Sequence, residues 1–131
     1  MSDSSHTFAT VISCMDGRIQ EPLRRFAVSH FDVDFVDVVT DRGGILRNWS
    51  EGNSGLVENF FQDIMVSLQV HKSRGIIVAG HQECAGYPVP DDKKKEEVLE
   101  VSKLIKERVG EAKVVPVFVF ESNGKWQVEI L

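Results

Sequence analysis

Short apolar runs rich in β-branched residues alternate along this chain with longer segments in which apolar residues recur at helical spacing. The runs that predict strands cover residues 7–13, 35–40, 75–80 and 114–120. The segments that predict helices cover residues 20–30, 56–71 and 96–109. Because apolar strands that alternate with helices form parallel sheets covered on both faces, we predict an α/β fold. Its architecture is a three-layer sandwich with a small, mainly parallel sheet and helices on both faces.

Turn and helix signals add detail to this outline. Ser122-Asn123-Gly124-Lys125 predicts a tight turn, so residues 126–131 return as an antiparallel edge strand in a C-terminal hairpin. Pro22 suits the first turn of its helix. Residues 45–54 are polar and predict a connection without secondary structure. Phe60 and Phe61 are adjacent on one helix, so we expect only one of them to face the core and the other to cover a subunit contact.

Size and charge restrict the class of protein. A length of 131 residues fits a single domain over 1–131, with residues 1–6 as a loose tail. The net charge of −5 argues against a nucleic-acid partner, and we expect Lys93-Lys94-Lys95 to be a solvated helix start. No apolar stretch is long enough to cross a bilayer, and the amino terminus is polar. We therefore expect a cytoplasmic protein that does not bind membranes.

Both cysteines of the chain lie in short motifs that directly follow predicted strands. Cys14 ends the first strand, and His81 and Cys84 come just after the strand over residues 75–80. Ligand sites in parallel sheets form beyond the carboxyl ends of strands, so the two motifs can meet. In a reducing compartment, metal binding is more plausible for such cysteines than a disulfide. Two thiolates and one imidazole predict a zinc site on Cys14, His81 and Cys84 with its fourth position open.

Two charged residues follow the first cysteine at short spacing. Arg18 can keep Asp16 ionised and oriented, and Asp16 can accept a hydrogen bond from a hydroxide on the zinc. The fourth ligand of the metal is then water, although the carboxylate of Asp16 is an alternative. Glu83 lies inside the second motif, and we interpret it as an exposed loop acid rather than a proton shuttle. We expect His6, His30 and His71 to be surface residues.

These motifs resemble the signature of β-class carbonic anhydrases. The similar features are Cys14-x-Asp16-x-Arg18, then His81-x-x-Cys84 at the end of a glycine-bounded strand, with the Gly43-Gly44-Ile45 step between them. The resemblance implies reversible hydration of carbon dioxide to bicarbonate by zinc-bound hydroxide. Cys14, His81 and Cys84 would hold the zinc, and Asp16 and Arg18 would be the catalytic pair. It also implies a homodimer or higher homo-oligomer, and substrate contacts from Gly43, Gly44, Ala85 and Gly86.

Two other functions remain open. The first is hydrolysis of a sulfur analogue of carbon dioxide, such as carbonyl sulfide or carbon disulfide, at the same site. The second is a zinc-binding domain of the same fold without turnover. Family members usually have an Arg-Asn-Ala-Gly step where this chain reads Thr40-Asp41-Arg42-Gly43-Gly44, and that departure favours the second alternative.

Overall fold

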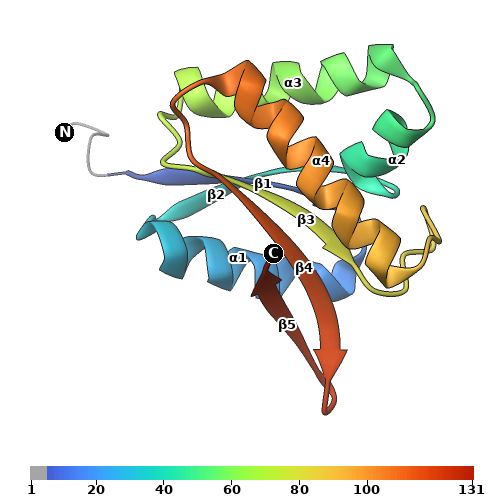
Figure 1. Cartoon of the computed structure of the whole chain (residues 1–131). Helices are drawn as coiled ribbons and strands as arrows, with labels where there is room; N and C mark the ends of the chain where they lie inside the picture. Colours follow the sequence, from blue (N-terminus) through green and yellow to red (C-terminus); the bar gives the residue numbers. More distant parts are fainter. Residues whose placement is uncertain (1–5) are drawn as a thin grey trace.

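A five-stranded sheet organises the computed structural model, which describes residues 6–131 (Figure 1). The elements are β1 (Phe8–Cys14), α1 (Gly17–Phe31), β2 (Phe35–Asp41), α2 (Gly44–Ser50), α3 (Ser54–Gln69), β3 (Ile76–His81), α4 (Asp91–Val109), β4 (Val114–Ser122) and β5 (Lys125–Ile130). The strand order is β2-β1-β3-β4-β5, in which only the β4–β5 pair is antiparallel. The predicted loose tail falls outside the described residues, apart from His6.

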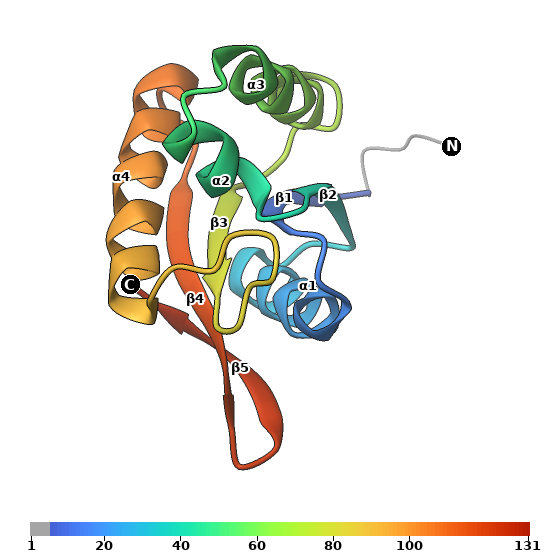
Figure 2. The same cartoon turned by 90° about the vertical axis from the view of Figure 1, so that its right-hand side faces the viewer.

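Helices cover both faces of the sheet, as predicted. Helix α1 lies on one face, and α2, α3 and α4 lie on the other (Figures 1 and 2). Two apolar clusters fill the spaces between these layers. One joins α1 to β1, β3 and β4, and the other joins the same sheet to α2, α3 and α4. The predicted three-layer α/β sandwich is therefore confirmed.

Helix α1 begins earlier than its apolar spacing indicated. The carboxylate of Asp16 accepts a hydrogen bond from the backbone N–H of Arg18 and so caps the helix at its amino end. Pro22 therefore lies inside the helix, and its prediction in the first turn was wrong. The helix tolerates this position because the missing N–H leaves only the carbonyl of Arg18, in the exposed first turn, without its helical partner.

The prediction of a connection over residues 45–54 was wrong for most of this range, because only residues 51–53 connect two helices without regular structure. Residues 44–50 form α2, in which Arg47 and Asn48 are buried although both are polar. Arg47 donates to the backbone oxygen of Arg42 (2.6 Å) and to the carboxylates of Asp41 (3.2 Å) and Glu51 (3.0 Å). Asn48 also donates to Asp41 (3.1 Å). These bonds let a polar segment fold as a buried helix turn.

Three further side chains differ from expectation. Phe60 and Phe61 are both buried members of the apolar cluster beneath α2, α3 and α4, and the guanidinium of Arg108 also lies over Phe61, 4.0 Å from the ring centroid. The expectation that only one faces the core was wrong. Lys93-Lys94-Lys95 does lie at the start of a helix, but Lys94 is buried rather than solvated. Its ammonium donates to the backbone oxygen of Tyr87 (2.7 Å) and lies over the Tyr87 ring.

The C-terminal hairpin forms as predicted. Asn123 and Gly124 both have positive φ angles, 53° and 77°, which a two-residue turn between twisted strands requires. The hairpin extends well beyond the body of the sheet (Figure 1). Within residues 6–131, no helix has both the length and the apolar character needed to cross a bilayer.

Candidate metal centre

The two cysteine motifs meet because their strands are neighbours in the sheet. β1 ends at Cys14 and β3 ends at His81, and the two strands pair in parallel, so both carboxyl ends reach the same edge. β2 pairs on the other side of β1 and ends level with it, with Cys14 opposite Asp41. The loop after β2, which contains Gly43 and Gly44, therefore reaches the same edge of the sheet.

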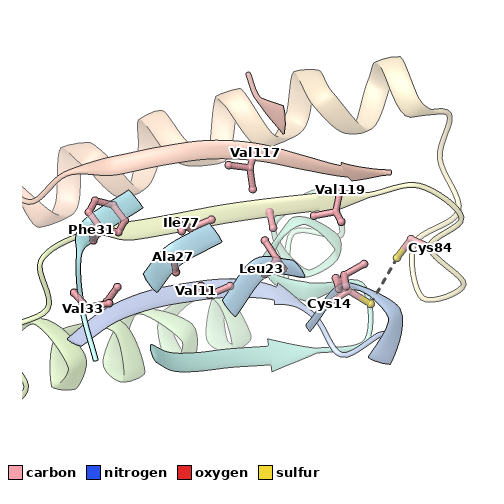
Figure 3. Packing of buried hydrophobic residues seen from close by; sticks show 13 residues of the cluster. Val11, Cys14, Leu23, Ala27, Phe31, Val33, Ile77, Cys84, Val117 and Val119 are labelled. Atoms are coloured by element: carbon pink, nitrogen blue, oxygen red, sulfur yellow. Dashed lines mark hydrogen bonds between the residues drawn. The ribbon is translucent and has the colours of Figure 1, made fainter. Parts of the chain in front are cut away.

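Cys14, His81 and Cys84 form a buried cluster of possible metal ligands. Their ligand atoms all lie within 4.8 Å of one another, and the two Sγ atoms are 3.8 Å apart (Figure 3). The three residues are only 2–6% exposed. Within residues 6–131, these three side chains form the group of at least three histidine, cysteine or acidic residues that is close enough together to hold a metal ion.

The imidazole of His81 is oriented as a metal ligand. Its Nδ1 lies 2.8 Å from the backbone oxygen of Gln82, an acceptor that requires a proton on Nδ1. Nε2 then carries a lone pair, and it is buried with no hydrogen-bond partner. An unpartnered buried nitrogen beside two sulfur atoms costs free energy unless something binds it. The residues present therefore fit a metal such as zinc, which commonly binds Cys₂His sets.

The two thiols influence each other's ionisation. Their contact raises the pKa of Cys14 to about 11 and lowers the pKa of Cys84 to about 5. One proton shared between the sulfur atoms stabilises the first thiolate and opposes the second. Burial raises both pKa values, whereas the positive charge of the buried Lys94 lowers that of Cys84. The pair therefore holds one thiolate without a metal, and a bound cation would replace the remaining proton.

The glycine loop after β2 contacts the centre through its backbone. The N–H of Gly43 donates to Sγ of Cys14 at 3.2 Å. Gly86 packs against this loop so closely that a Cβ atom there would lie 2.5 Å from the nitrogen of Gly43. Gly44 starts α2 at a φ angle of 63°, against the backbone of Ser13. These glycines allow the three loops to meet at Cys14.

The glycine positions and Ala85 were predicted as substrate contacts, and that role stays a prediction. Gly43, Gly44 and Gly86 lie at the centre with the close approaches just described. Ala85 is exposed and lines a surface depression of about 460 Å³, which Cys84 and Glu83 also border. This depression therefore borders one of the predicted metal ligands, Cys84.

Asp16 and Arg18 form a close ion pair beside the cluster. Nη2 of Arg18 donates to Oδ2 of Asp16 at 2.7 Å, and Nε donates to Oδ1 at 3.1 Å. Hydrogen bonding to Arg18 lowers the pKa of Asp16 to about 2, against a smaller opposing effect of burial. Asp16 is not part of the three-ligand cluster. Both of its oxygens are held by Arg18 instead, and its role as a fourth ligand stays a prediction.

Two contacts of Arg18 were not predicted. Nη1 donates to the carboxylate of Glu83 at 3.0 Å, and Nη2 donates to the Glu83 backbone oxygen at 3.1 Å. Glu83 is exposed, as expected, but it joins the second motif to the first. The indole ring of Trp126 in β5 covers the guanidinium, whose carbon lies 4.7 Å from the ring centroid. Sequence distance conceals both contacts, because the hairpin and the loop after β3 approach Arg18 only in the folded chain.

The remaining histidines lie away from the centre. His6 and His30 are exposed and contact the rings of Phe35 and Phe26. His71 is not a simple surface residue, because its Nδ1 lies 2.6 Å from the carboxylate of Asp37 and its ring stacks on Phe8. His71 therefore has a structural role at the amino ends of β1 and β2.

Comparison with known proteins agrees with the motifs. The family model described as "Putative carbonic anhydrase" matches residues 4–131. No curated protein matches the chain.

Proposed function

The chain belongs to the family described as "Putative carbonic anhydrase", and on this premise we propose that it is a zinc-dependent lyase that interconverts carbon dioxide and bicarbonate. The observation that carries the proposal is the buried Cys14–His81–Cys84 cluster with the unpartnered Nε2 of His81. Three protein ligands leave one position of a tetrahedral ion open. A zinc ion in this cluster supplies a Lewis acid that lowers the pKa of a water molecule to near neutrality.

In this proposal the ion pair of Asp16 and Arg18 beside the cluster orients the attacking water molecule. The carboxylate of Asp16 stays ionised throughout the neutral range because its pKa is near 2. An ionised carboxylate accepts a hydrogen bond from the attacking water and so orients it towards the substrate. Arg18 holds the carboxylate through two of its nitrogens, which fixes the direction of that hydrogen bond.

The proposal extends to the substrate and the assembly. Carbon dioxide is small and linear, so it needs no large pocket, and the shallow depression beside Cys84 and Ala85 suits its entry. The backbone of the Gly43–Gly44 loop and of Ala85–Gly86 would contact it there. We also propose a homodimer, because the open edge strand β2 exposes Phe35 and Val38.

The test compares the wild-type protein with Asp16→Asn at equal zinc content. Stopped-flow carbon dioxide hydration should fall by about 10²-fold in the variant, since the amide lacks the charge that orients the attacking water. Zinc content, measured by atomic absorption, should not change, because Asp16 lies outside the ligand cluster. Glu21→Gln, on the exposed face of α1, is the control and should keep the wild-type rate.

Each other outcome identifies an alternative. Loss of zinc from Asp16→Asn would make the carboxylate a metal ligand instead of a catalytic group. Zinc-loaded wild-type protein without carbon dioxide hydration would contradict the proposal. The same protein would then be assayed with carbonyl sulfide and carbon disulfide. Turnover of either sulfur analogue would indicate the hydrolase, and turnover of neither would indicate a zinc domain without catalysis.

A further inference from the structure

The ring of Trp126 occupies a position that neither the metal cluster nor the ion pair requires. It lies over the guanidinium of Arg18 at 4.7 Å, within the range of a cation–π contact. Trp126 comes from β5, at the far end of the chain from Arg18 in α1. The side chain is half-buried and also packs on the apolar cluster beneath α1. Trp126 thus joins the C-terminal hairpin to the residue that holds Asp16.

The side chain of Arg18 is exposed enough to adopt several conformations unless another contact holds it. Its side chain is 44% exposed, and exposed ion pairs are weak because two long side chains must give up their rotamer freedom. Its guanidinium also serves two carboxylates at once, since Glu83 accepts from Nη1 while Asp16 accepts from Nε and Nη2. A depression of about 610 Å³ borders Arg18, so the guanidinium has room to turn away from Asp16.

A flat ring restricts this freedom in a specific way. The guanidinium is planar, and stacking one face on an indole leaves only its edges available for hydrogen bonds. In the structure the guanidinium carbon lies over the ring, the Nε–Nη2 edge donates to Asp16, and Nη1 and Nη2 donate to Glu83. A ring in this position therefore favours the bidentate pair with Asp16 over the many single-contact arrangements of an exposed arginine.

The hairpin itself is tied to the loop that follows β3. The backbone N–H of Gln82 donates to the oxygen of Val119 at 3.0 Å, and the Gln82 side chain accepts from the N–H of Glu121 at 2.9 Å. Glu121 pairs directly with Trp126 across the hairpin. Gln82 stands between His81 and Glu83, so these hydrogen bonds join the strand pair that carries the ring to the second cysteine motif.

We propose that Trp126 is a positioning residue that holds the guanidinium of Arg18 in the plane that pairs with Asp16. The expected effect of Trp126 on kcat rests on the proposed hydration activity, whereas its expected effect on the order of the Arg18 side chain does not. Without the ring, the exposed guanidinium of Arg18 turns away from Asp16 into solvent for part of the time. Asp16 is then less well directed, and the chemical step slows although the metal cluster is intact.

The experiment uses three variants of the zinc-loaded protein. Trp126→Leu keeps apolar bulk but removes the flat ring, and Trp126→Phe keeps a smaller flat ring. Val128→Ala is the matched control, because Val128 packs on the same cluster from the same strand but offers no ring to Arg18. The readouts are kcat and KM for carbon dioxide, zinc content, and the order parameter of the Arg18 Nε–H from ¹⁵N relaxation.

Trp126→Leu should lower kcat on the order of tenfold with KM and zinc content unchanged, and should lower the Arg18 order parameter. Trp126→Phe should keep most of the wild-type kcat and most of the wild-type order parameter of Arg18. Val128→Ala should have the wild-type values of both quantities. In the wild-type protein, Arg18 should be more ordered than Arg24, which has an ion pair to Glu21 but no ring contact among the described residues. This comparison uses only the wild-type protein, so it does not depend on whether a variant folds.

Three results would overturn the proposal. They are an undiminished Arg18 order parameter in Trp126→Leu, an equal loss of kcat in Val128→Ala, and an Arg18 no more ordered than Arg24 in the wild type. If the wild-type protein does not hydrate carbon dioxide, the proposed function fails. The order parameters then decide on Trp126 by themselves.

Discussion

The proton shared by Cys14 and Cys84 determines what zinc must displace when it binds. The contact between the two sulfur atoms lowers the pKa of Cys84 to about 5, so the pair holds one thiolate at neutral pH. The same contact raises the pKa of Cys14 to about 11, so the pair also keeps one proton. Zinc binds both as thiolates, so its uptake at pH 7 should release about one proton from the pair. Two independent thiols of ordinary pKa, near 8.5, would release about two.

Isothermal titration calorimetry measures this number directly. Zinc is added to the metal-free protein at pH 7 in buffers of different ionisation enthalpy, and the slope of the observed enthalpy gives the protons released. The sign of the pH dependence follows from the same values. Affinity should rise by about tenfold per pH unit between pH 6 and 7, because one proton leaves the thiol pair per zinc bound. The titration is repeated at pH 6, where a water molecule on the zinc keeps its proton, and a slope near two protons there would show that the thiols do not share a proton.

At the scale of single residues, the sequence predicts the members of the site better than their contacts. Cys14, His81 and Cys84 could be identified because each directly follows an apolar strand, and parallel neighbours end at one edge. The partners of Arg18 could not, because Glu83 and Trp126 approach it through tertiary structure. Lys94 also escapes prediction, since nothing in its lysine-rich surroundings indicates burial. Its stem packs where a Cβ on Gly80 would lie, 2.9 Å from Lys94 Cγ.

At the scale of elements, the Gly43–Gly44 loop links the start of α2 to the metal centre. Gly43 has a φ angle of 72°, and a Cβ atom there would lie 2.9 Å from Cβ of Arg47 and 3.0 Å from Cβ of Tyr87. Gly43→Ala should therefore force the loop away from Arg47. The N–H of Gly43 would then move from Sγ of Cys14, which weakens zinc binding as well as the fold.

Gly124→Ala is a matched control for this prediction. Gly124 has a similar φ angle of 77°, but a Cβ atom there would meet nothing within 4 Å. It should cost only the backbone strain, about 1 kcal/mol of unfolding free energy. Gly43→Ala should cost about 2 kcal/mol more because of the overlap, and should also lower zinc affinity. Denaturant unfolding and competition with a zinc chelator measure the two effects, and equal losses in both variants would contradict the account.

The sequence predicts those elements whose apolar pattern is independent of their neighbours. β3 is an apolar run bounded by glycines, and the Asn123–Gly124 turn is fixed by local backbone geometry. Helix α2 has neither signal, because it buries Arg47 and Asn48. The guanidinium of Arg47 and the amide nitrogen of Asn48 donate to Asp41, Arg42 and Glu51, partners that a reading of local polarity does not reveal, whereas Oδ1 of Asn48 is buried without a partner among the described residues. Phe61 was misjudged for a related reason, since Arg108 of another helix covers it.

At the scale of the whole molecule, the β2 edge of the sheet has no neighbouring strand within the described chain. Its Phe35 and Val38 side chains are 47% and 51% exposed. An exposed apolar edge strand favours pairing with a second copy. Light scattering after size-exclusion chromatography should therefore give twice the chain mass of 14.7 kDa. Val38→Lys should shift the protein towards monomer, whereas a wild-type monomer would contradict the predicted dimer.

We propose that zinc held by Cys14, His81 and Cys84 makes this protein a carbon dioxide hydratase. The most direct measurement is stopped-flow hydration by metal-free wild-type protein to which zinc is added in steps. We expect a rate that rises in proportion to bound zinc and stops rising at one zinc per chain. Cys84→Ser, which removes one ligand, should bind zinc weakly and stay inactive over the same range. Full zinc occupancy without hydration, or hydration that does not follow bound zinc, would contradict the claim.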